Sequence, residues 1–163
     1  MSLKEYWSDF RRRWFRSSSD DYLGAVGILS RCYEQERQHA LRFRRHAEKM
    51  HYPQFRQTLA RIAAEADKHA DLLAEKIKSF SVRVPEVMQT PVGSGNSWSL
   101  LLQDLEEERR SAERLYDQMR DIGADFPDIL EILHRIDQDN REHRAAIREI
   151  LMRSDPQAMS EVA

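Results

Sequence analysis

Apolar residues recur along most of the chain at alternating steps of three and four residues. This spacing places them on one face of an α-helix and is typical of a helical bundle. It predicts four long helices, over residues 20–50, 53–80, 97–122 and 126–153. The predicted core faces are Tyr22, Val26, Leu29, Tyr33, Glu36, Ala40, Phe43, Ala47, Met50; Phe55, Leu59, Ile62, Ala66, His69, Leu73, Ile77; Leu101, Leu105, Glu108, Ala112, Leu115, Met119, Ile122; and Ile129, Leu133, Ile136, Asn140, His143, Ile147, Ile150.

Each apolar face is interrupted near its middle by a polar residue. The first face carries Glu36, the second His69, the third Glu108, and the fourth Asn140 with His143. Burying a carboxylate costs free energy unless it is paired or binds a metal. The central polar residues are therefore the candidate functional groups.

The lengths of the connections predict the topology. The first and last links hold only a few residues, and Pro53 and Pro127 suit first helical turns, with Asp125 as the expected N-cap of the last helix and Gly123 as a C-terminal residue of the third. The middle link, 81–96, could span roughly 50 Å when extended, enough to run the length of a helix of about 40 Å. The second and third helices should therefore run parallel, in two antiparallel hairpins joined by a long crossover.

The N-terminal segment, Ser2–Arg16, predicts a separate short amphipathic helix. Its aromatic face is Leu3, Trp7, Phe10 and Trp14, with Tyr6 and Phe15 at the edges. The stretch Ser17–Asp21 predicts a linker, with Ser18 or Ser19 as N-cap of the next helix. The expected organisation is residues 1–19 as this helix and linker, 20–153 as the bundle, and 154–163 as a frayed tail. The aromatic face could pack on the bundle or a second copy, or contact a membrane surface.

Composition narrows the class of protein. The 163 residues suit one domain, 40% are hydrophobic and 33% charged, and the net charge of −2 does not favour nucleic acid. The single cysteine, Cys32, excludes an internal disulfide and is interpreted as a small buried hydrophobe. No apolar run is long enough to span a membrane and no secretory signal is evident, so a cytoplasmic location is expected.

The two predicted hairpins resemble one another in sequence. A shift of 72 residues places Glu36 on Glu108, and a shift of 74 places His69 on His143 and Glu65 on Asp139. Each half of the chain therefore offers the same set of polar residues, which a random scatter of charges would not produce.

These residues resemble the ferritin-like superfamily, nearest in layout to the rubrerythrin-type domain, over about residues 20–152. That family holds a di-iron or di-manganese centre with two single Glu residues and two Glu-x-x-His pairs. The resemblance implies that Glu36, Glu108, His69 and His143 are metal ligands. At the bridging Glu positions this chain has Ala66 and Asn140, and the acids stand one place earlier, as Glu65 and Asp139. Those two acids either ligate the metal directly or hydrogen-bond the ring nitrogen of each histidine that does not face the metal.

The resemblance implies a non-haem di-iron centre, with manganese as the other candidate metal, and iron oxidation or reduction of oxygen or peroxide as an oxidoreductase or ferroxidase. It also implies a homo-oligomer, expected here to be a dimer formed by the N-terminal helix or a bundle face. The alternative is a metal-free bundle serving as an assembly module, in which the polar residues are satisfied by Arg37, Arg110, Arg141 and Arg144. His39 is an additional candidate ligand off the apolar face, whereas His46, His51 and His134 are expected at the surface or in turns.

Overall fold

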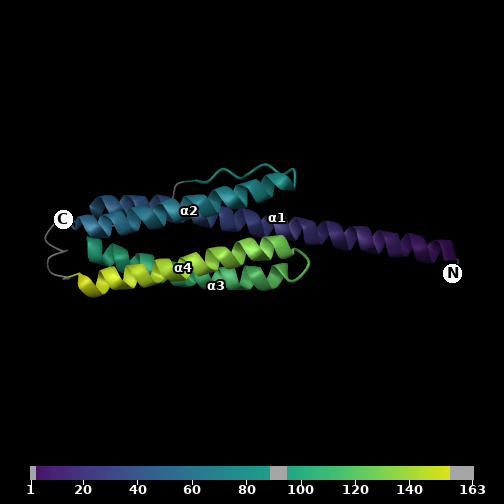
Figure 1. Ribbon diagram of the computed structural model, residues 1–163. Coiled ribbons are helices and arrows are strands. Elements are labelled where there is room, and N and C mark those ends of the chain that lie inside the picture. Colours follow the sequence, from purple (N-terminus) through teal and green to yellow (C-terminus); the bar gives the residue numbers. More distant parts are fainter. Residues whose placement is uncertain (1–2, 89–94, 155–163) are drawn as a thin grey trace.

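The computed structural model describes the backbone of residues 3–88 and 95–154, and the side chains of residues 21–88 and 95–154. The described part contains only helices and connections: α1 (Leu3–Lys49), α2 (Pro53–Ser79), α3 (Ser97–Ile122) and α4 (Pro127–Arg153). The four helices lie alongside one another as a bundle (Figure 1). The all-α prediction is confirmed.

The connectivity also agrees with the prediction. α1 and α2 form one antiparallel hairpin, α3 and α4 form the other, and α2 and α3 run in the same direction (Figure 1). The hairpins pack with α1 against α3 and α2 against α4. The start of the crossover after α2 has no regular structure, and the Tyr22 hydroxyl donates a 2.6 Å hydrogen bond to the Phe80 carbonyl there.

Helix α1 differs from its prediction at the N-terminal end. It is one continuous helix of 47 residues that extends past the other three helices, so the expected linker at residues 17–21 and the N-cap at Ser18 or Ser19 were wrong (Figure 1). Serine and aspartate favour caps, but in a helix interior they cost only about 0.5 kcal/mol each relative to alanine, and a continuing helix tolerates that. The expected frayed tail lies almost wholly outside the described residues.

The other helix ends follow the turn residues closely. Pro53 and Pro127 occupy the first turns of α2 and α4, and Gly123, at φ 58°, ends α3 in the positive-φ region that favours glycine. The N-cap of α4 is Phe126 rather than Asp125, without a side-chain hydrogen bond. Asn96 caps α3 by accepting a 2.9 Å hydrogen bond from the Ser99 amide.

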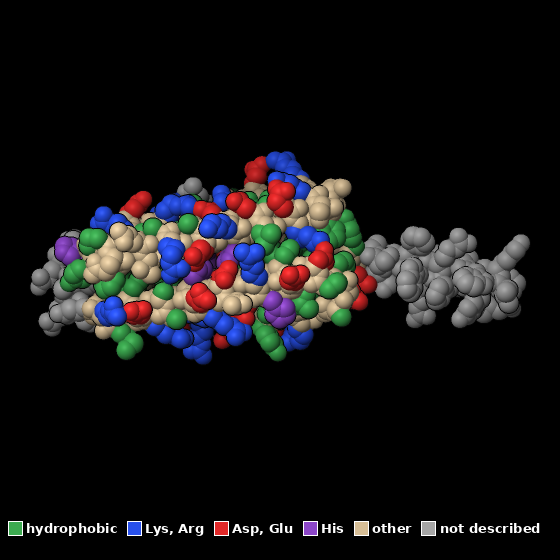
Figure 2. All heavy atoms as spheres, in the orientation of Figure 1, with side chains coloured by type: hydrophobic (Ala, Val, Ile, Leu, Met, Phe, Trp, Pro, Cys, Tyr) green, Lys and Arg blue, Asp and Glu red, His purple; other side chains and the backbone are tan. Residues whose placement is uncertain are grey.

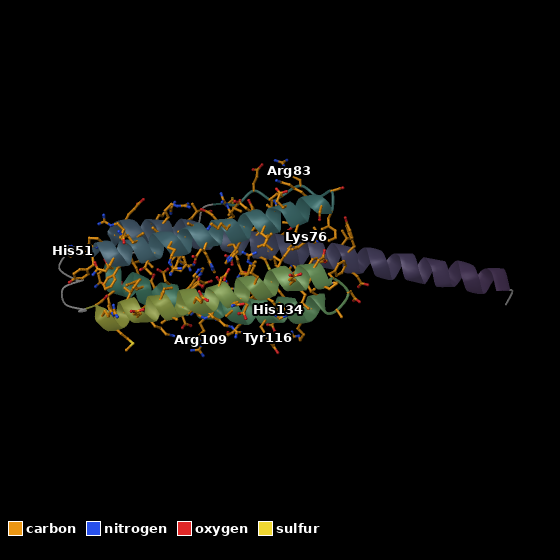
Figure 3. All side chains as sticks on the ribbon, in the orientation of Figure 1. His51, Lys76, Arg83, Arg109, Tyr116 and His134 are labelled. Atoms are coloured by element: carbon orange, nitrogen blue, oxygen red, sulfur yellow. The ribbon has the colours of Figure 1, made fainter. Side chains whose placement is uncertain are left out.

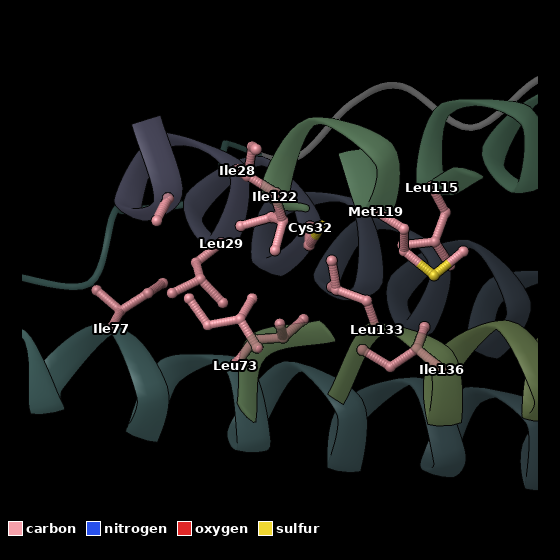
Figure 4. Close-up of a cluster of buried hydrophobic side chains, with 12 residues drawn as sticks. Ile28, Leu29, Cys32, Leu73, Ile77, Leu115, Met119, Ile122, Leu133 and Ile136 are labelled. Carbon is pink, nitrogen blue, oxygen red and sulfur yellow. The ribbon is translucent and has the colours of Figure 1, made fainter. Parts of the chain in front are cut away.

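The core consists of two apolar clusters separated by a polar layer. The first cluster lies toward the α1 N-terminal side of the bundle (Figure 4) and contains Ala25, Ile28, Leu29, Cys32, Leu73, Ile77, Leu115, Met119, Ile122, Ile129, Leu133 and Ile136. The second contains Phe43, Ala47, Met50, Phe55, Leu59, Ile62, Ala63, Leu101, Ile147 and Ile150. Between the two clusters lie the buried polar residues Glu36 and His39 of α1, His69 of α2, Asp104, Glu108 and Ser111 of α3, and Asn140 and His143 of α4, whereas buried His46 and Gln118 lie within the clusters. Tyr22, a predicted core residue, is 37% exposed instead.

The outer surface mixes charges of both signs. Basic and acidic side chains alternate over the face seen in Figure 2, and labelled residues such as Arg109, Tyr116 and His134 point away from the bundle (Figure 3). Within the described residues, no helix combines the length and the apolar character that crossing a membrane requires.

Candidate metal centre in the polar layer

Two acid–histidine pairs cross between α2 and α4. Nε2 of His69 on α2 lies 2.9 Å from Oδ2 of Asp139 on α4, and Nε2 of His143 on α4 lies 2.7 Å from Oε2 of Glu65 on α2. Both rings are buried, whereas the two carboxylates are partly exposed. Each acid thus approaches its histidine from the solvent side and fixes the orientation of the ring.

The inner nitrogen of His69 faces a buried carboxylate. Its Nδ1 lies 3.2 Å from Oε2 of Glu36, and the Asn140 amide donates a 3.4 Å hydrogen bond to Oε1 of the same residue. Glu36 and His69 therefore meet at the centre of the bundle, as the sequence predicted. Asn140, a neutral amide, occupies one of the two positions at which the ferritin-like pattern has a bridging carboxylate.

Protonation in this cluster follows from its contacts. Burial favours the neutral form of Glu36, but the His69 hydrogen bond, the nearby charge of His39 and the Asn140 amide outweigh burial and lower its pKa. Burial also opposes the charge on His69, yet Glu36 and Asp139 on its two nitrogens raise its pKa. For Glu65, burial is outweighed by hydrogen bonds from His143 and Arg61, which lower its pKa.

Glu108 belongs to a second cluster, between α1 and α3. Its Oε1 lies 3.1 Å from Nδ1 of His39 and accepts a 3.3 Å hydrogen bond from Nη2 of Arg42. Its Oε2 is buried and has no hydrogen-bond partner among the described residues. One oxygen of Glu108 is thus neutralised by α1, and the other remains an available acceptor inside the bundle.

The same interface continues with residues whose role the sequence did not reveal. Arg42 Nε donates a 2.8 Å hydrogen bond to Oδ1 of Asp104, and Nδ1 of His46 lies 2.6 Å from Oδ2 of Asp104. Asp104 is fully buried and His46 is 1% exposed, so the expectation of His46 at the surface was wrong. Toward the other end of the interface, Cys32 Sγ donates to Oε1 of Gln118 at 3.1 Å.

A signal for this interface was present in the sequence. Cys32, Gln35, His39, Arg42 and His46 follow one another at alternating steps of three and four residues, which places them on one face of α1. Because this face is polar, the spacing of apolar residues does not reveal it. On α3, Asp104, Ser111 and Gln118 are buried, each one residue before a predicted core position. Of those predicted positions, Leu105 and Ala112 are only partly buried, whereas Met119 is buried as well.

Cys32 is buried, as predicted. Burial, with the charge of Glu36 next, raises the pKa of its thiol to about 12. A thiol of this kind stays protonated at neutral pH and is a poor metal ligand or nucleophile.

A cleft of about 1140 Å³ leads from the surface to the α1–α3 side of the polar layer. Its lining includes His39 and Arg42, both of which contact Glu108, together with Gln38 of α1, Met88 of the crossover and Leu102 of α3. Small polar species can therefore reach the groups that surround Glu108 without unfolding the bundle.

The arginines expected to satisfy the polar residues pair elsewhere. Arg37 pairs with Asp67 at 2.7 Å, Arg110 with Glu106 at 3.3 Å and Arg141 with Asp137 at 2.6 Å. Nη1 of Arg144 is buried without a hydrogen-bond partner in the described region. Among the arginines that the structure describes, Arg42 contacts the central carboxylate of Glu108. His51 and His134 are exposed, as expected.

These residues fit only in part the di-iron centre that the ferritin-like resemblance implies. Glu36, Glu108, His69 and His143 are buried in one layer, and the unpartnered Oε2 of Glu108 is an acceptor suited to a cation. Ala66 and Asn140 are also buried, however, and neither offers a bridging carboxylate. Within the described residues, no three His, Cys, Asp or Glu side chains are already gathered as a metal-binding group. The donors thus suit a metal ion but lack the bridges of a carboxylate-linked pair.

Comparison with known proteins gives the fold. No protein-family profile and no curated protein matches the sequence. Among solved structures, the chain is similar to a dodecameric thioferritin, the bacterioferritin-related protein from Bacteroides fragilis, with a TM-score of 0.71 and 18% identity over 78% of this chain and 84% of that one.

Two further structures agree. The bacterioferritin of Desulfovibrio desulfuricans, described with a di-iron site, has a TM-score of 0.73 and 15% identity over 88% of this chain and 89% of that one. Dps92 from Deinococcus radiodurans has a TM-score of 0.70 and 14% identity over 85% and 91%. The chain therefore has the ferritin-like four-helix fold.

Proposed function

We propose that this protein binds iron in the polar layer of a ferritin-like bundle. Glu36, Glu108, His69 and His143 would hold the ion, and Glu65 and Asp139 would orient the two imidazoles through Nε2. The observation that carries the proposal is the pair of crossed acid–histidine contacts, at 2.9 and 2.7 Å. An acid behind the imidazole fixes the tautomer and strengthens the ring as a ligand, as metal-bound histidines require.

The ligand chemistry supports a transition metal. Carboxylates and imidazoles together suit iron or manganese, and the same ferritin-like fold carries a di-iron site in the bacterioferritin compared above. Bound iron would supply one-electron redox chemistry, in iron oxidation or in reduction of oxygen or peroxide. The surrounding residues keep the ligands oriented and largely shielded from bulk water. The rubrerythrin-type assignment and the cytoplasmic location stay predictions.

In the metal-free protein, a proton on His69 supplies the positive charge between the carboxylates of Glu36 and Asp139. The ring has carboxylate oxygens at both nitrogens, 3.2 and 2.9 Å away, an arrangement that the doubly protonated imidazolium satisfies by donating twice. A metal ion at Nδ1 would displace that proton, because only a deprotonated nitrogen can ligate. Binding should therefore release protons.

The first test is anaerobic titration with Fe²⁺. Glu36→Ala and Glu108→Ala should abolish binding, since each removes a buried carboxylate of the site. Glu34→Ala and Glu106→Ala are matched controls on the same helices, because both side chains are exposed, and they should bind as the wild type does. Isothermal titration calorimetry measures the affinity, and metal analysis after desalting measures the content.

The same titration distinguishes the role of Glu65. If Glu65 only orients His143 through its contact with Nε2, Glu65→Ala should weaken iron binding by roughly 10- to 100-fold. A complete loss would make it a direct ligand. Wild-type protein that takes up no iron would contradict the proposed function.

A metal-free bundle is the second candidate, and one observation favours it. Ala66 and Asn140 replace the two bridging carboxylates, and all four central ligands except one oxygen of Glu108 can be satisfied within a protein network. Such a protein would act through its surface as an assembly module. It predicts no Fe²⁺ uptake by any variant.

The proposed assembly is a homo-oligomer formed through the N-terminal part of α1. This part extends beyond the other three helices (Figure 1), and its sequence has Leu3 and five aromatic residues on or beside one face, including Trp7, Phe10 and Trp14. An apolar face of this size is seldom left in water.

Deletion of residues 1–17 should therefore lower the oligomeric mass measured by light scattering. The cut falls within α1 and before Ala25, the first buried residue among the described side chains, so the bundle should keep its helical circular dichroism. An unchanged mass together with loss of liposome binding would instead assign the segment to a membrane surface.

A further inference from the structure

The two halves of the polar layer are related in sequence but differ in their charges. Glu36 and Glu108 occupy equivalent positions, and the residues equivalent to His39 and Arg42 on α3 are Ser111 and Arg114. Arg42 reaches Glu108, whereas Arg114 pairs with the partly exposed Glu107 at 2.6 Å. The internal symmetry is therefore broken by a cation on one side only.

Arg42 links two buried carboxylates. Its Nε donates to Asp104 at 2.8 Å and its Nη2 to Glu108 at 3.3 Å, and these acids are 0% and 1% exposed. The guanidinium is a permanent cation whose planar fork suits such bridging. It neutralises carboxylates at the edge of the polar layer as a metal ion would.

Among the described side chains, no arginine or lysine makes a comparable contact with Glu36. The contacts of Glu36 are with His69 and Asn140, which are a titratable ring and a neutral amide. An imidazole nitrogen can ligate a metal ion, whereas a guanidinium keeps its positive charge and cannot. A metal ion beside Glu36 therefore meets no arginine among these contacts, whereas an ion beside Oε1 of Glu108 meets Arg42.

Glu108 can contribute to one ion at most through its unpartnered oxygen. Its Oε1 is occupied by His39 and Arg42, and only Oε2 remains. A second cation bound to Oε1 would meet the guanidinium at close range and be repelled. The missing bridges at Ala66 and Asn140 remove the carboxylates that would offset this repulsion.

We infer that Arg42 takes the place of a second metal ion, so that this bundle binds one iron per chain rather than a di-iron pair. The inference rests on the proposed function and deepens it, since it sets the number of ions that the Glu36 half and Oε2 of Glu108 hold. It also makes Arg42 a residue that determines the stoichiometry of the centre.

The test compares metal ratios in the full-length chain. Fe²⁺ is added anaerobically, and native mass spectrometry counts the ions bound per chain. The variant is Arg42→Met combined with Asp104→Asn, which removes the guanidinium and one of the two buried charges that it neutralises. The matched control is Asp104→Asn alone, which keeps Arg42 on Glu108.

The expected ratios are one iron for the wild type, one for Asp104→Asn and two for the double variant. A wild-type ratio of two would overturn the inference while leaving the proposed function intact. A wild-type ratio of zero would overturn both. A double variant that keeps its helical circular dichroism and its first ion but gains no second would overturn the role of Arg42. Should the double variant lose its helical signal, Arg42→Gln with Asp104→Asn, which keeps a polar group beside Glu108, replaces it.

Discussion

Replacing Arg42 by methionine should lower the free energy of unfolding of the metal-free protein by about 3–5 kcal/mol, the usual loss when one partner of a buried ion pair is removed. Methionine fills much of the space of the arginine stem but leaves Asp104 and Glu108 without their shared cation. Both carboxylates are almost fully buried, so the loss of their shared cation leaves two buried charges poorly compensated. Urea denaturation followed by circular dichroism measures the change.

Arg44→Met is the matched control, two residues along the same helix. Arg44 pairs with Asp67, but its side chain is 50% exposed, and exposed pairs contribute only about 0–1 kcal/mol. The two variants remove the same chemical group from the same helix. Equal losses for the two would contradict the structural role assigned to Arg42.

The sequence was sufficient to predict the fold because periodicity and connection length are strong signals. The apolar faces of α2 and α4 were predicted residue by residue, and Pro53, Gly123 and Pro127 lie at the expected helix ends. The long link between α2 and α3 required a crossover, and the parallel direction of those helices follows from it. Helix periodicity and connection length together leave few possible topologies for the four helices.

The N-terminal end of α1 was not predictable in the same way. Ser18 and Ser19 are good N-caps in isolation, yet capping preference is a local effect of about 1 kcal/mol, and the helix continues through them. The capping preference of single residues therefore indicates a possible helix start, but it is too weak to end a helix that continues past it.

The candidate site was predicted in part. The central positions of Glu36, His69, Glu108 and His143 followed from the apolar faces around them, and all four are buried. Their role as ligands stays a prediction. The contacts between α1 and α3 were not predicted, because His39, Arg42 and His46 lie on a polar face, where burial cannot be distinguished from exposure by hydrophobicity alone.

A second substitution with a large expected effect is Glu36→Leu. As a general rule, replacing a buried carboxylate by an apolar residue stabilises a metal-free bundle when the carboxylate has no partners, because the cost of burying the charge is removed. The structure reverses the expected sign, because His69 and Asn140 both direct nitrogens at Glu36 and would be left without their acceptor. Removing one partner of a buried hydrogen-bonded charge pair costs about 3–5 kcal/mol, and leucine cannot replace the hydrogen bonds. Glu36→Gln keeps an acceptor oxygen and should lose less.

The loss caused by Glu36→Leu should depend on pH in protein freed of metal by a chelator. The pKa of Glu36 is lowered from 4.5, so its stabilising effect is present above pH 4.5 and is lost as the pH falls through the lowered value. The pKa of His69 is raised from 6.5, so its effect is present below pH 6.5 and is lost as the pH rises through the raised value. The difference in unfolding free energy between wild type and Glu36→Leu should therefore be largest from about pH 4.5 to 6.5. Denaturant titrations of both proteins at a series of pH values measure it, and a difference that does not vary with pH would show that Glu36 and His69 do not form an ion pair.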